Sequence, residues 1–272
     1  MDIVYLYDIV QQELHKAQAY GLIITNSSER QAEETKTSTY CHIGGRCGSG
    51  FMERLMLAFG TSAFLKLVCL NERPQRTVIR QRVQASGDGY DFHRSLRLRI
   101  QRHLAAGEPM ADVLASIDEI RRVSERNSAR NGLEALEVWR GAHTGVVSGY
   151  SSVTYESPSG LFRVAFTPDF GIRMGGSGVA VHVWNTKQPQ LLREMTYGVL
   201  ALFKSIYDEV DKAPNDLAVL SLPDSKLYRL SEAGPCADMG DDLAARIESI
   251  VREVRDELGL PDEDEHPPQP RP

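Results

Sequence analysis

The stretch LFRVAFTPDFGIRMGGSGVAVHVWNTKQPQLLREMTYGVLALF, Leu161 to Phe203, contains two apolar runs separated by the turn sequence GGSG. The first run, LFRVAFTPD, alternates as a strand does and ends at Asp169 after a proline, which cannot donate to a sheet ladder. The second run, VAVHVWNTK, is almost wholly apolar and predicts a central strand that ends with Asn185 and Lys187. If the two strands pair across GGSG, Asp169 is expected to lie near Asn185, with Lys187 on the same face.

The segments around this stretch predict a mixed sheet covered by helices. SSVTYES alternates as a strand does, and QPQLLREMTYGVLALFKSIYDEV predicts a helix that begins near Pro189. DLAVLSLPDSKLYRLSE predicts a hairpin around LPDSK, and GDDLAARIESIVREVRDELG predicts a final amphipathic helix. Two strands joined through a helix are expected to be parallel, whereas strands joined by short turns are expected to be antiparallel, so the sheet contains both kinds of pair. We therefore expect an α/β (α+β) fold, with a mixed central sheet flanked by helices.

The N-terminal part of the chain has a helical pattern. DIVYLYDIVQQELHKAQAY carries an apolar stripe, GFMERLMLAFGTSAFLKLVCL predicts one buried helix, and Asp91 is placed to cap a helix over FHRSLRLRIQRHLAAG. EPMADVLASIDEIRRVSERNSAR and NGLEALEVWRGAH predict two further helices, whereas residues 25–40 are polar and predict a loop. We expect a helical region over 1–130, a core over 131–258 and a disordered acidic, proline-rich tail over 259–272.

The composition is that of an ordinary globular protein, since 42% of the 272 residues are hydrophobic and 25% are charged. No apolar run approaches the roughly 18 residues that span a bilayer, and no signal-peptide pattern is present, so we expect a cytoplasmic protein with no membrane partner. The four cysteines, at 41, 47, 69 and 236, are too few and too unevenly spaced for a disulfide framework. The net charge of −6 disfavours a protein coated with nucleic acid, but binding depends on local basic surface.

Asp169, Asn185 and Lys187 are the residue types that a hard divalent cation and a phosphate require. Mg²⁺ prefers a carboxylate and further oxygen ligands, so Asp169 is the expected anionic ligand and the amide oxygen of Asn185 a neutral one. A lysine beside the metal orients the attacking water and offsets phosphate charge. A simpler interpretation stays open, namely a turn at Asp169, a helix cap at Asn185 and a solvated Lys187.

The sequence PD followed by a hydrophobic strand ending in NTK resembles the PD-(D/E)XK nuclease superfamily, which includes many type II restriction endonucleases. The superfamily's order of a helix, three antiparallel strands, a helix and a further strand matches the order expected over roughly residues 131–232. The resemblance implies a metal-dependent DNA endonuclease of restriction type that hydrolyses phosphodiester bonds with Mg²⁺, or with Mn²⁺ as a substitute. Asp169 matches the aspartate of PD and Lys187 the lysine, whereas Asn185 stands at the position of the second acidic residue.

That departure removes one negative charge from the implied metal site. The superfamily often adds an acid from its first helix, and Glu134 and Glu137 are the candidates, with Glu156 on the first strand as a third. A double-strand cutter needs two active sites, so the implied partners are double-stranded DNA and a second copy of the chain, with the helical region serving recognition or dimerisation. One alternative is a catalytically silent module of the same fold that binds nucleic acid or a protein partner. Another is a helical interaction protein unrelated to nucleic acid.

Arginines are the candidate nucleic-acid ligands, because a guanidinium binds phosphates and guanine edges. The segment 73–103 is rich in them, and Arg94, Arg97 and Arg99 are the leading choices. Arg46 and Ser49, in the glycine-rich segment CHIGGRCGSG, are further phosphate ligands if the protein binds DNA. The equally weighted alternative pairs the arginines with the acidic C-terminal helix. No Ser-His-Asp or Cys-His pattern is evident from spacing alone.

Overall fold

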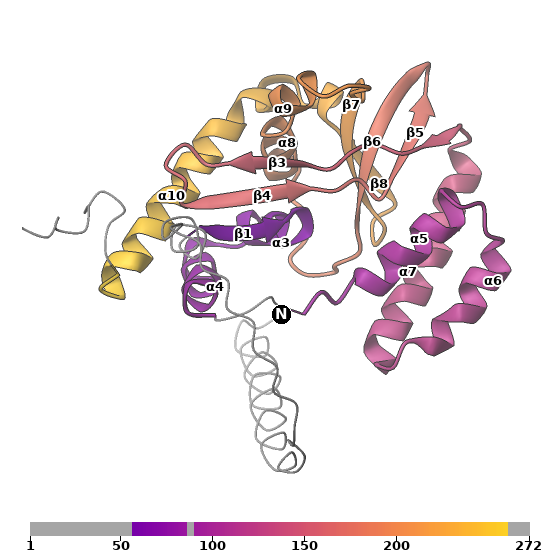
Figure 1. Ribbon diagram of the computed structural model, residues 1–272, viewed down its shortest axis with the longest axis horizontal. Coiled ribbons are helices and arrows are strands. Elements are labelled where there is room, and N and C mark those ends of the chain that lie inside the picture. The colour runs from indigo at the N-terminus through magenta and orange to yellow at the C-terminus, as the bar shows by residue number, and fades with distance from the viewer. Residues whose placement is uncertain (1–55, 86–89, 261–272) are drawn as a thin grey trace, which may run out of the picture. The chain divides into compact units, whose positions relative to one another are not determined.

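The computed structural model describes residues 56–85 and 90–260 (Figure 1). Several expectations therefore lie outside the described residues. They are the first helix, the polar loop over 25–40, the glycine-rich segment with Arg46 and Ser49, and the tail beyond Leu260.

Along the described chain, one strand and a run of helices precede a run of strands, a further pair of helices, a hairpin and a final helix. The helices are α3 (Thr61–Val68), α4 (Glu72–Gln84), α5 (Arg94–Leu104), α6 (Met110–Ala115), α7 (Val123–Ala142), α8 (Arg193–Ala201), α9 (Lys204–Asp208) and α10 (Met239–Glu257), with 3₁₀ turns η1 (Ser116–Glu119), η2 (Leu230–Glu232) and η3 (Gly234–Asp238). The strands are β1 (Leu57–Gly60), β2 (Val147–Ser148), β3 (Val153–Glu156), β4 (Phe162–Phe166), β5 (Phe170–Met174), β6 (Ser177–Trp184), β7 (Asp216–Ser221) and β8 (Lys226–Arg229).

The strands form two sheets, and the larger one has the order β2-β5-β6-β7-β8. In it β6 is central and parallel to β7, with α8 and α9 between them in the chain, and the other pairs are antiparallel. The smaller sheet has the order β1-β4-β3, with β1 parallel and β3 antiparallel to β4. The second half of β6 is buried on both faces, which explains its nearly continuous apolar sequence.

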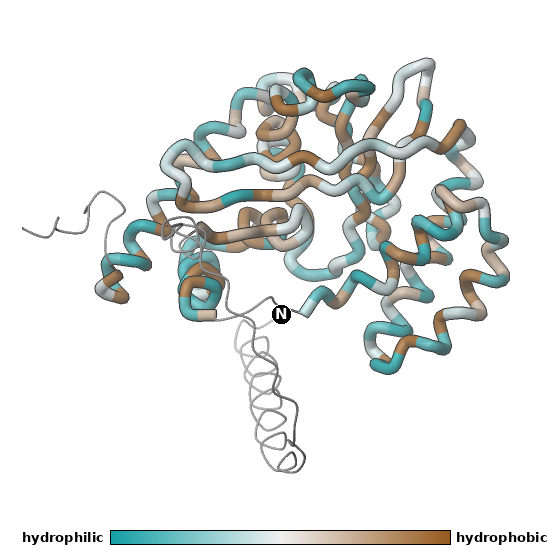
Figure 2. Tube along the Cα trace, viewed as in Figure 1, coloured by the Kyte–Doolittle hydropathy of each residue, from teal (hydrophilic) through white to brown (hydrophobic). Residues whose placement is uncertain are grey.

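Two hydrophobic clusters lie on opposite faces of the five-stranded sheet. One contains Val179, Val181 and Val183 of β6 together with side chains of α5, α6 and α7. The other contains Ala180 and Trp184 of β6 together with side chains of the smaller sheet, α3, α8 and α10. Figure 2 shows how hydrophobic and hydrophilic residues alternate along these strands and helices. Along β6, odd-numbered residues therefore face α7 and even-numbered residues face α3.

The mixed sheet flanked by helices is confirmed, with the difference that there are two sheets. The strands predicted around Val153, Phe162 and Val181, the hairpin β7–β8 and the amphipathic α10 are all present. In the described ranges, no helix has the length and apolar character needed to cross a membrane.

The prediction of a single helix over GFMERLMLAFGTSAFLKLVCL is wrong in its described part. Residues Leu57–Gly60 form β1, and the helix α3 begins only at Thr61. A short apolar run fits a buried strand as well as a helix, and here the parallel pairing with β4 decides. Gly60 keeps an extended backbone, with φ −82° and ψ 161°, at the step from strand to helix.

The helix predicted over EPMADVLASIDEIRRVSERNSAR is divided into α6, η1 and the start of α7, and α7 continues without a break through the helix predicted over NGLEALEVWRGAH. The expected boundary between the helical region and the core therefore falls inside α7. Gly132 lies inside α7 without breaking it, and at this position the helix packs closely against neighbouring residues. A Cβ there would come within 2.9 Å of Leu96 and 3.0 Å of Asn185. The glycine thus lets α7 approach both α5 and the end of β6.

The strand assignment around Asp169 is also corrected. β4 ends at Phe166, and Asp169 immediately precedes β5, a strand that was not expected. The turn at Gly175 and Gly176, both with positive φ, joins β5 to β6. Because β6 ends at Trp184, Asn185 and Lys187 follow the strand, and period-two alternation no longer places them on one face.

Candidate functional site

Asp169 is fixed against β6 at the start of β5. Its backbone N–H donates to the carbonyl oxygen of Val181 over 2.8 Å, and its Oδ2 accepts the N–H of Val183 over 2.7 Å. The side chain is only 1% exposed, and Oδ1 lies 3.9 Å from Nε of Arg97 on α5. A buried carboxylate needs such partners, and here one oxygen is hydrogen-bonded while the other faces a guanidinium across a longer gap.

His182, on β6, connects Asp169 to Ser62. Its Nδ1 lies 3.3 Å from Oδ2 of Asp169 and 3.3 Å from the carbonyl oxygen of Thr167. Both neighbours are acceptors, so Nδ1 carries the proton in the neutral ring and Nε2 has a free lone pair. The hydroxyl of Ser62 lies 2.8 Å from Nε2 and donates to it.

Ser62 is the second residue of α3, directly after the step from β1 through Gly60 and Thr61. The hydroxyl of Thr61 donates to the carbonyl oxygen of Ala165 over 2.8 Å and ties the helix start to β4. Ser62 is half-buried, whereas His182 is 3% exposed. The helix start thus presents a serine hydroxyl to a buried imidazole.

Asn185 serves the other side of the five-stranded sheet. Its Nδ2 donates to the carbonyl oxygen and to the hydroxyl of Ser128 on α7, each over 3.1 Å. Within the described ranges Asn185 and Asp169 share no hydrogen bond. Asn185 is not a helix cap either, because α8 begins only at Arg193. The asparagine joins the end of β6 to α7.

The remaining candidate residues do not converge on Asp169. Lys187 and Glu134 are exposed. The carboxylate of Glu137 lies 3.5 Å from Nε2 of His103 on α5, so this side chain contacts α5 and not Asp169. Glu156 is exposed on β3. No hydrogen bond or ion pair among the described residues joins any of them to Asp169, so these residues do not meet at one point.

The side chains as they lie do not fit a Mg²⁺ site. Among the described residues, no three His, Cys, Asp or Glu are grouped to hold a metal ion. Mg²⁺ demands near-octahedral oxygen ligands at about 2.0–2.1 Å and is usually held by one or two carboxylates. Asp169 offers one carboxylate whose outer oxygen faces Arg97, and Asn185 directs its amide nitrogen to Ser128.

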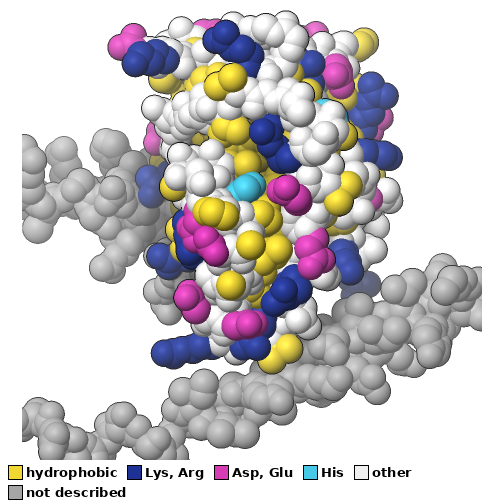
Figure 3. All heavy atoms as spheres, turned by 90° about the vertical axis from the view of Figure 1, so that its right-hand side faces the viewer, with side chains coloured by type: hydrophobic (Ala, Val, Ile, Leu, Met, Phe, Trp, Pro, Cys, Tyr) yellow, Lys and Arg dark blue, Asp and Glu magenta, His cyan; other side chains and the backbone are white. Residues whose placement is uncertain are grey.

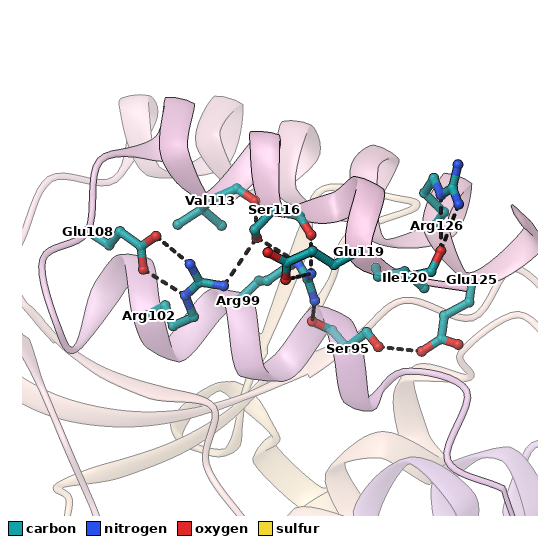
Figure 4. A network of polar contacts seen from close by, with 10 residues as sticks. All are labelled: Ser95, Arg99, Arg102, Glu108, Val113, Ser116, Glu119, Ile120, Glu125 and Arg126. Atoms are coloured by element: carbon teal, nitrogen blue, oxygen red, sulfur yellow. Dashed lines mark hydrogen bonds and ion pairs between the residues drawn. The ribbon is translucent and has the colours of Figure 1, made fainter. Parts of the chain in front are cut away.

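The arginines of α5 differ in what they contact. Arg97 pairs with Asp91 and faces Asp169. Arg99 is 7% exposed and donates to the carbonyl and hydroxyl oxygens of Ser116 and to the carbonyl of Ser95, as Figure 4 shows. Burial lowers the pKa of Arg99. Arg94 is exposed and makes no ion pair with any described residue.

The alternative pairing with the C-terminal helix is confirmed for α4. Arg76 bonds to Glu253 and Glu257 of α10, and Arg80 bonds to Glu257. These arginines hold α4 and α10 together, so they are not unpaired cations of the kind expected to bind nucleic acid.

An open pocket of about 440 Å³ lies between α5 and the start of α7. Its volume is within the range of small-ligand sites. Its charged lining consists of Arg94, Arg99, Arg121, Arg122, Asp91, Glu119 and Glu125. Figure 3 looks at the side where α5, α6 and α7 lie, and shows basic and acidic side chains intermixed around hydrophobic ones. The face is therefore no uniform basic surface, and any anion site on it is local.

The carboxylates of this pocket already have partners. Asp91 pairs with Arg97, and Glu119 lies 3.6 Å from Arg99. Glu125 accepts hydrogen bonds from the hydroxyls of Ser95 and Tyr90. Burial opposes ionisation of Glu125, but these two hydrogen bonds, together with the charges of Arg122 and Arg99, outweigh it and hold its pKa below the ordinary value.

Two arginines of the pocket remain available. Arg94 and Arg121 are exposed and form no ion pair in the part of the chain that the structure describes. Arg122 lies with its guanidinium 4.0 Å from the ring centroid of Tyr90, whose side chain is exposed. The pocket thus combines free guanidinium groups with an accessible aromatic ring.

His93 lies between this pocket and the end of β6. Its Nε2 is 3.1 Å from the hydroxyl of Thr186, and its Nδ1 is buried without a hydrogen-bond partner among the described residues. Burial, and to a lesser extent the charge of Arg97, lowers the pKa of His93. The ring is therefore neutral near pH 7.

Ser62 and His182 are the residues of the site that the sequence did not reveal. A local signal existed in AFGTS, where an apolar run meets glycine and then serine, which is typical of a strand that turns into a helix. That signal was hidden because the run also fits a helix. The pairing with His182 has no local signal at all, since the two residues are 120 positions apart.

Comparison with known proteins adds little. No protein family model matches the chain, and no curated protein matches it. A solved structure described as "Crystal structure of SSO0001" is 12% identical, with 69% of this chain and 84% of that chain covered and a TM-score of 0.27. A similarity at that TM-score carries no argument about fold or function.

Proposed function

We propose that this chain is a catalytically silent module with a nuclease-like order of elements. In this proposal it binds DNA and does not catalyse metal-dependent cleavage. One observation carries the proposal, namely the pocket beside α5 in which Arg94 and Arg121 form no ion pair with a described residue while the carboxylates are paired. Guanidinium groups of this kind bind phosphate oxygens. Tyr90, 58% exposed, offers a ring on which a base stacks.

The order of elements supports the same proposal. Helix α7 is followed by β5 and β6, which are antiparallel, then by α8, and then by β7 parallel to β6. The larger sheet keeps part of the order that the resemblance to PD-(D/E)XK nucleases implied, although through β2 and β5 and not through the strands that were expected there. The short β2 pairs with β5 at the position of the first strand, and β3 and β4 form a separate sheet.

The way in which the polar groups are used supports a module that does not cut DNA with a divalent metal. Asp169 is engaged by Val183, His182 and Arg97, and Asn185 is engaged by Ser128. Replacing the second acidic residue by asparagine also removes charge that a cation needs. In this proposal, the residues of the implied metal site serve as structural contacts.

The test is DNA binding by fluorescence anisotropy over a range of salt concentrations. Replacing both Arg94 and Arg121 with Gln is expected to weaken binding and to reduce the slope of log K against log salt by roughly one unit per lost phosphate contact. The matched control replaces two exposed arginines outside the pocket, Arg73 of α4 and Arg163 of β4, with Gln, which changes the net charge equally. An identical loss in both double variants would contradict the assignment of the pocket.

Tyr90→Ala sharpens this test. If a base stacks on the ring, the variant weakens binding of a single strand more than binding of a duplex of the same sequence, because duplex bases are already stacked. A loss that is equal for both ligands contradicts stacking and leaves a phosphate-only pocket.

A second candidate function is the metal-dependent endonuclease. The observation in its favour is Oδ1 of Asp169, whose contact with Arg97 is long, at 3.9 Å, and which accepts no hydrogen bond from any described residue. This candidate also implies a homodimer for double-strand cutting. Cleavage assays separate it from the silent module, and light scattering tests the dimer.

A further inference from the structure

We propose that Ser62, His182 and Asp169 form a serine hydrolase centre that cleaves carboxylic esters. The inference does not depend on DNA binding. It rests on one continuous chain of contacts, with 2.8 Å between Ser62 Oγ and His182 Nε2 and 3.3 Å between His182 Nδ1 and Asp169 Oδ2. A nucleophile, a base and a group that orients the base are the parts such a centre needs.

The imidazole is in the tautomer that a general base requires. Two acceptors, Oδ2 of Asp169 and the carbonyl of Thr167, face Nδ1, so the proton resides there. Nε2 is then free to accept the proton of Ser62. Asp169 is itself held by the N–H of Val183 and is 1% exposed, so it positions the ring without contacting the substrate. The 3.3 Å contact is long, but such hydrogen bonds tighten when substrate binds.

The position of Ser62 in the helix supplies the site for the oxyanion. The first N–H groups of a helix have no intrahelical acceptor and carry the positive end of its dipole. Ser62 lies in the first turn of α3, and the N–H of Ala63 directly after it is one of these groups. A Cβ at Gly60 would meet no described atom within 4 Å, so space is open beside the strand-to-helix step.

The reaction balances with water as the only co-substrate. Ser62 Oγ bonds to the acyl carbon as its proton passes to Nε2 of His182, and the oxyanion is held by the start of α3. The bond from the acyl carbon to the alcohol oxygen then breaks, and the alcohol leaves with the proton from Nε2. Water attacks the acyl-serine, gives a proton to Nε2, and releases the carboxylic acid as Ser62 regains its proton.

A fluorophosphonate probe tests the nucleophile directly. Ser62 Oγ bonds to phosphorus and displaces fluoride, so peptide mass spectrometry locates the adduct. Labelling of wild type at Ser62 is expected, with its rate and the rate of p-nitrophenyl acetate hydrolysis falling at least about 100-fold in Ser62→Ala. Ser249→Ala, an exposed serine on α10, serves as the matched control and keeps the wild-type rate.

Further variants separate chemistry from folding and from the proposed function. Asp169→Asn is expected to lower kcat more than KM and to change the pH profile, because it acts on the tautomer of His182. Ser62→Ala is expected to remain folded by circular dichroism and to bind DNA as wild type does. EDTA is expected to leave labelling unchanged. Natively folded wild type that is not labelled, or Ser62→Ala that is labelled equally, would overturn the proposal whatever the outcome for DNA.

Discussion

Ser62 Oγ and His182 Nε2 lie 2.8 Å apart, although 120 residues separate them in the sequence. The contact joins the start of α3, beside the smaller sheet, to the second half of the central strand of the larger sheet. His182 in turn lies against Asp169, the residue that the sequence marked as a metal ligand. Asp169 therefore lies in a group with His182 and Ser62, and not in the group with Asn185 and Lys187 that the sequence predicts.

Asp169→Asn is expected to lower the free energy of unfolding by about 1–3 kcal/mol, because a hydrogen bond to a charged group is lost and Arg97 then faces a neutral side chain. Urea denaturation measures the change. Asp211→Asn, at an exposed position, is the control and is expected to stay within about 0.5 kcal/mol of wild type. No loss in Asp169→Asn would show that the carboxylate is not committed to these contacts.

Much of the fold was predictable, because β6 and α10 carry strong periodic patterns and the β7–β8 hairpin has a clear turn. The failures have physical causes. The apolar run before Ser62 fits the periodicity of a strand as well as that of a helix. The strand β5 is short and contains Gly171, against which Tyr150 packs closely. At the site, local spacing predicted that Asp169 lies near the end of β6, and Asp169 does contact Val183, although it precedes β5 and does not end the strand that was expected. Local spacing could not show that Asn185 turns to α7 while Asp169 contacts His182, because tertiary packing makes that choice.

Arg99 is expected to be a structural residue. Arg99→Lys should cost roughly 2–3 kcal/mol, because a single ammonium cannot replace the guanidinium fork that serves both oxygens of Ser116 and the carbonyl of Ser95. Thermal or urea unfolding measures it, with Arg94→Lys as an exposed control on the same helix. Equal stabilities of the two variants would contradict the structural role.

Glu125 is expected to contribute to acid sensitivity. Its pKa in the folded state lies below the ordinary value of 4.5, so its contribution is fully present above that pH and is lost as the pH falls through the folded pKa. Stability of wild type against pH should therefore fall more steeply below about pH 4.5 than that of Glu125→Gln. Parallel pH profiles for the two proteins would exclude Glu125 from the acid transition.

Tyr150 packs across the hairpin β5–β6, and this makes a paired test possible. A Cβ at Gly178 would lie 2.1 Å from the Tyr150 hydroxyl oxygen, with the next atom at 3.4 Å. Gly178→Ala is expected to cost about 1–3 kcal/mol. Adding Tyr150→Phe removes the close oxygen and is expected to recover part of that loss. A double variant no more stable than Gly178→Ala alone would disprove the clash as the cause.

The most direct test of the account is incubation of supercoiled plasmid with purified protein and Mg²⁺ or Mn²⁺, followed on one gel for cutting and for retardation. The account predicts that the plasmid is retarded and remains supercoiled, because Asp169 serves His182 and Asn185 serves Ser128. Nicking by wild type that disappears in both Asp169→Ala and Lys187→Ala would contradict it. That result would establish the metal-dependent nuclease instead.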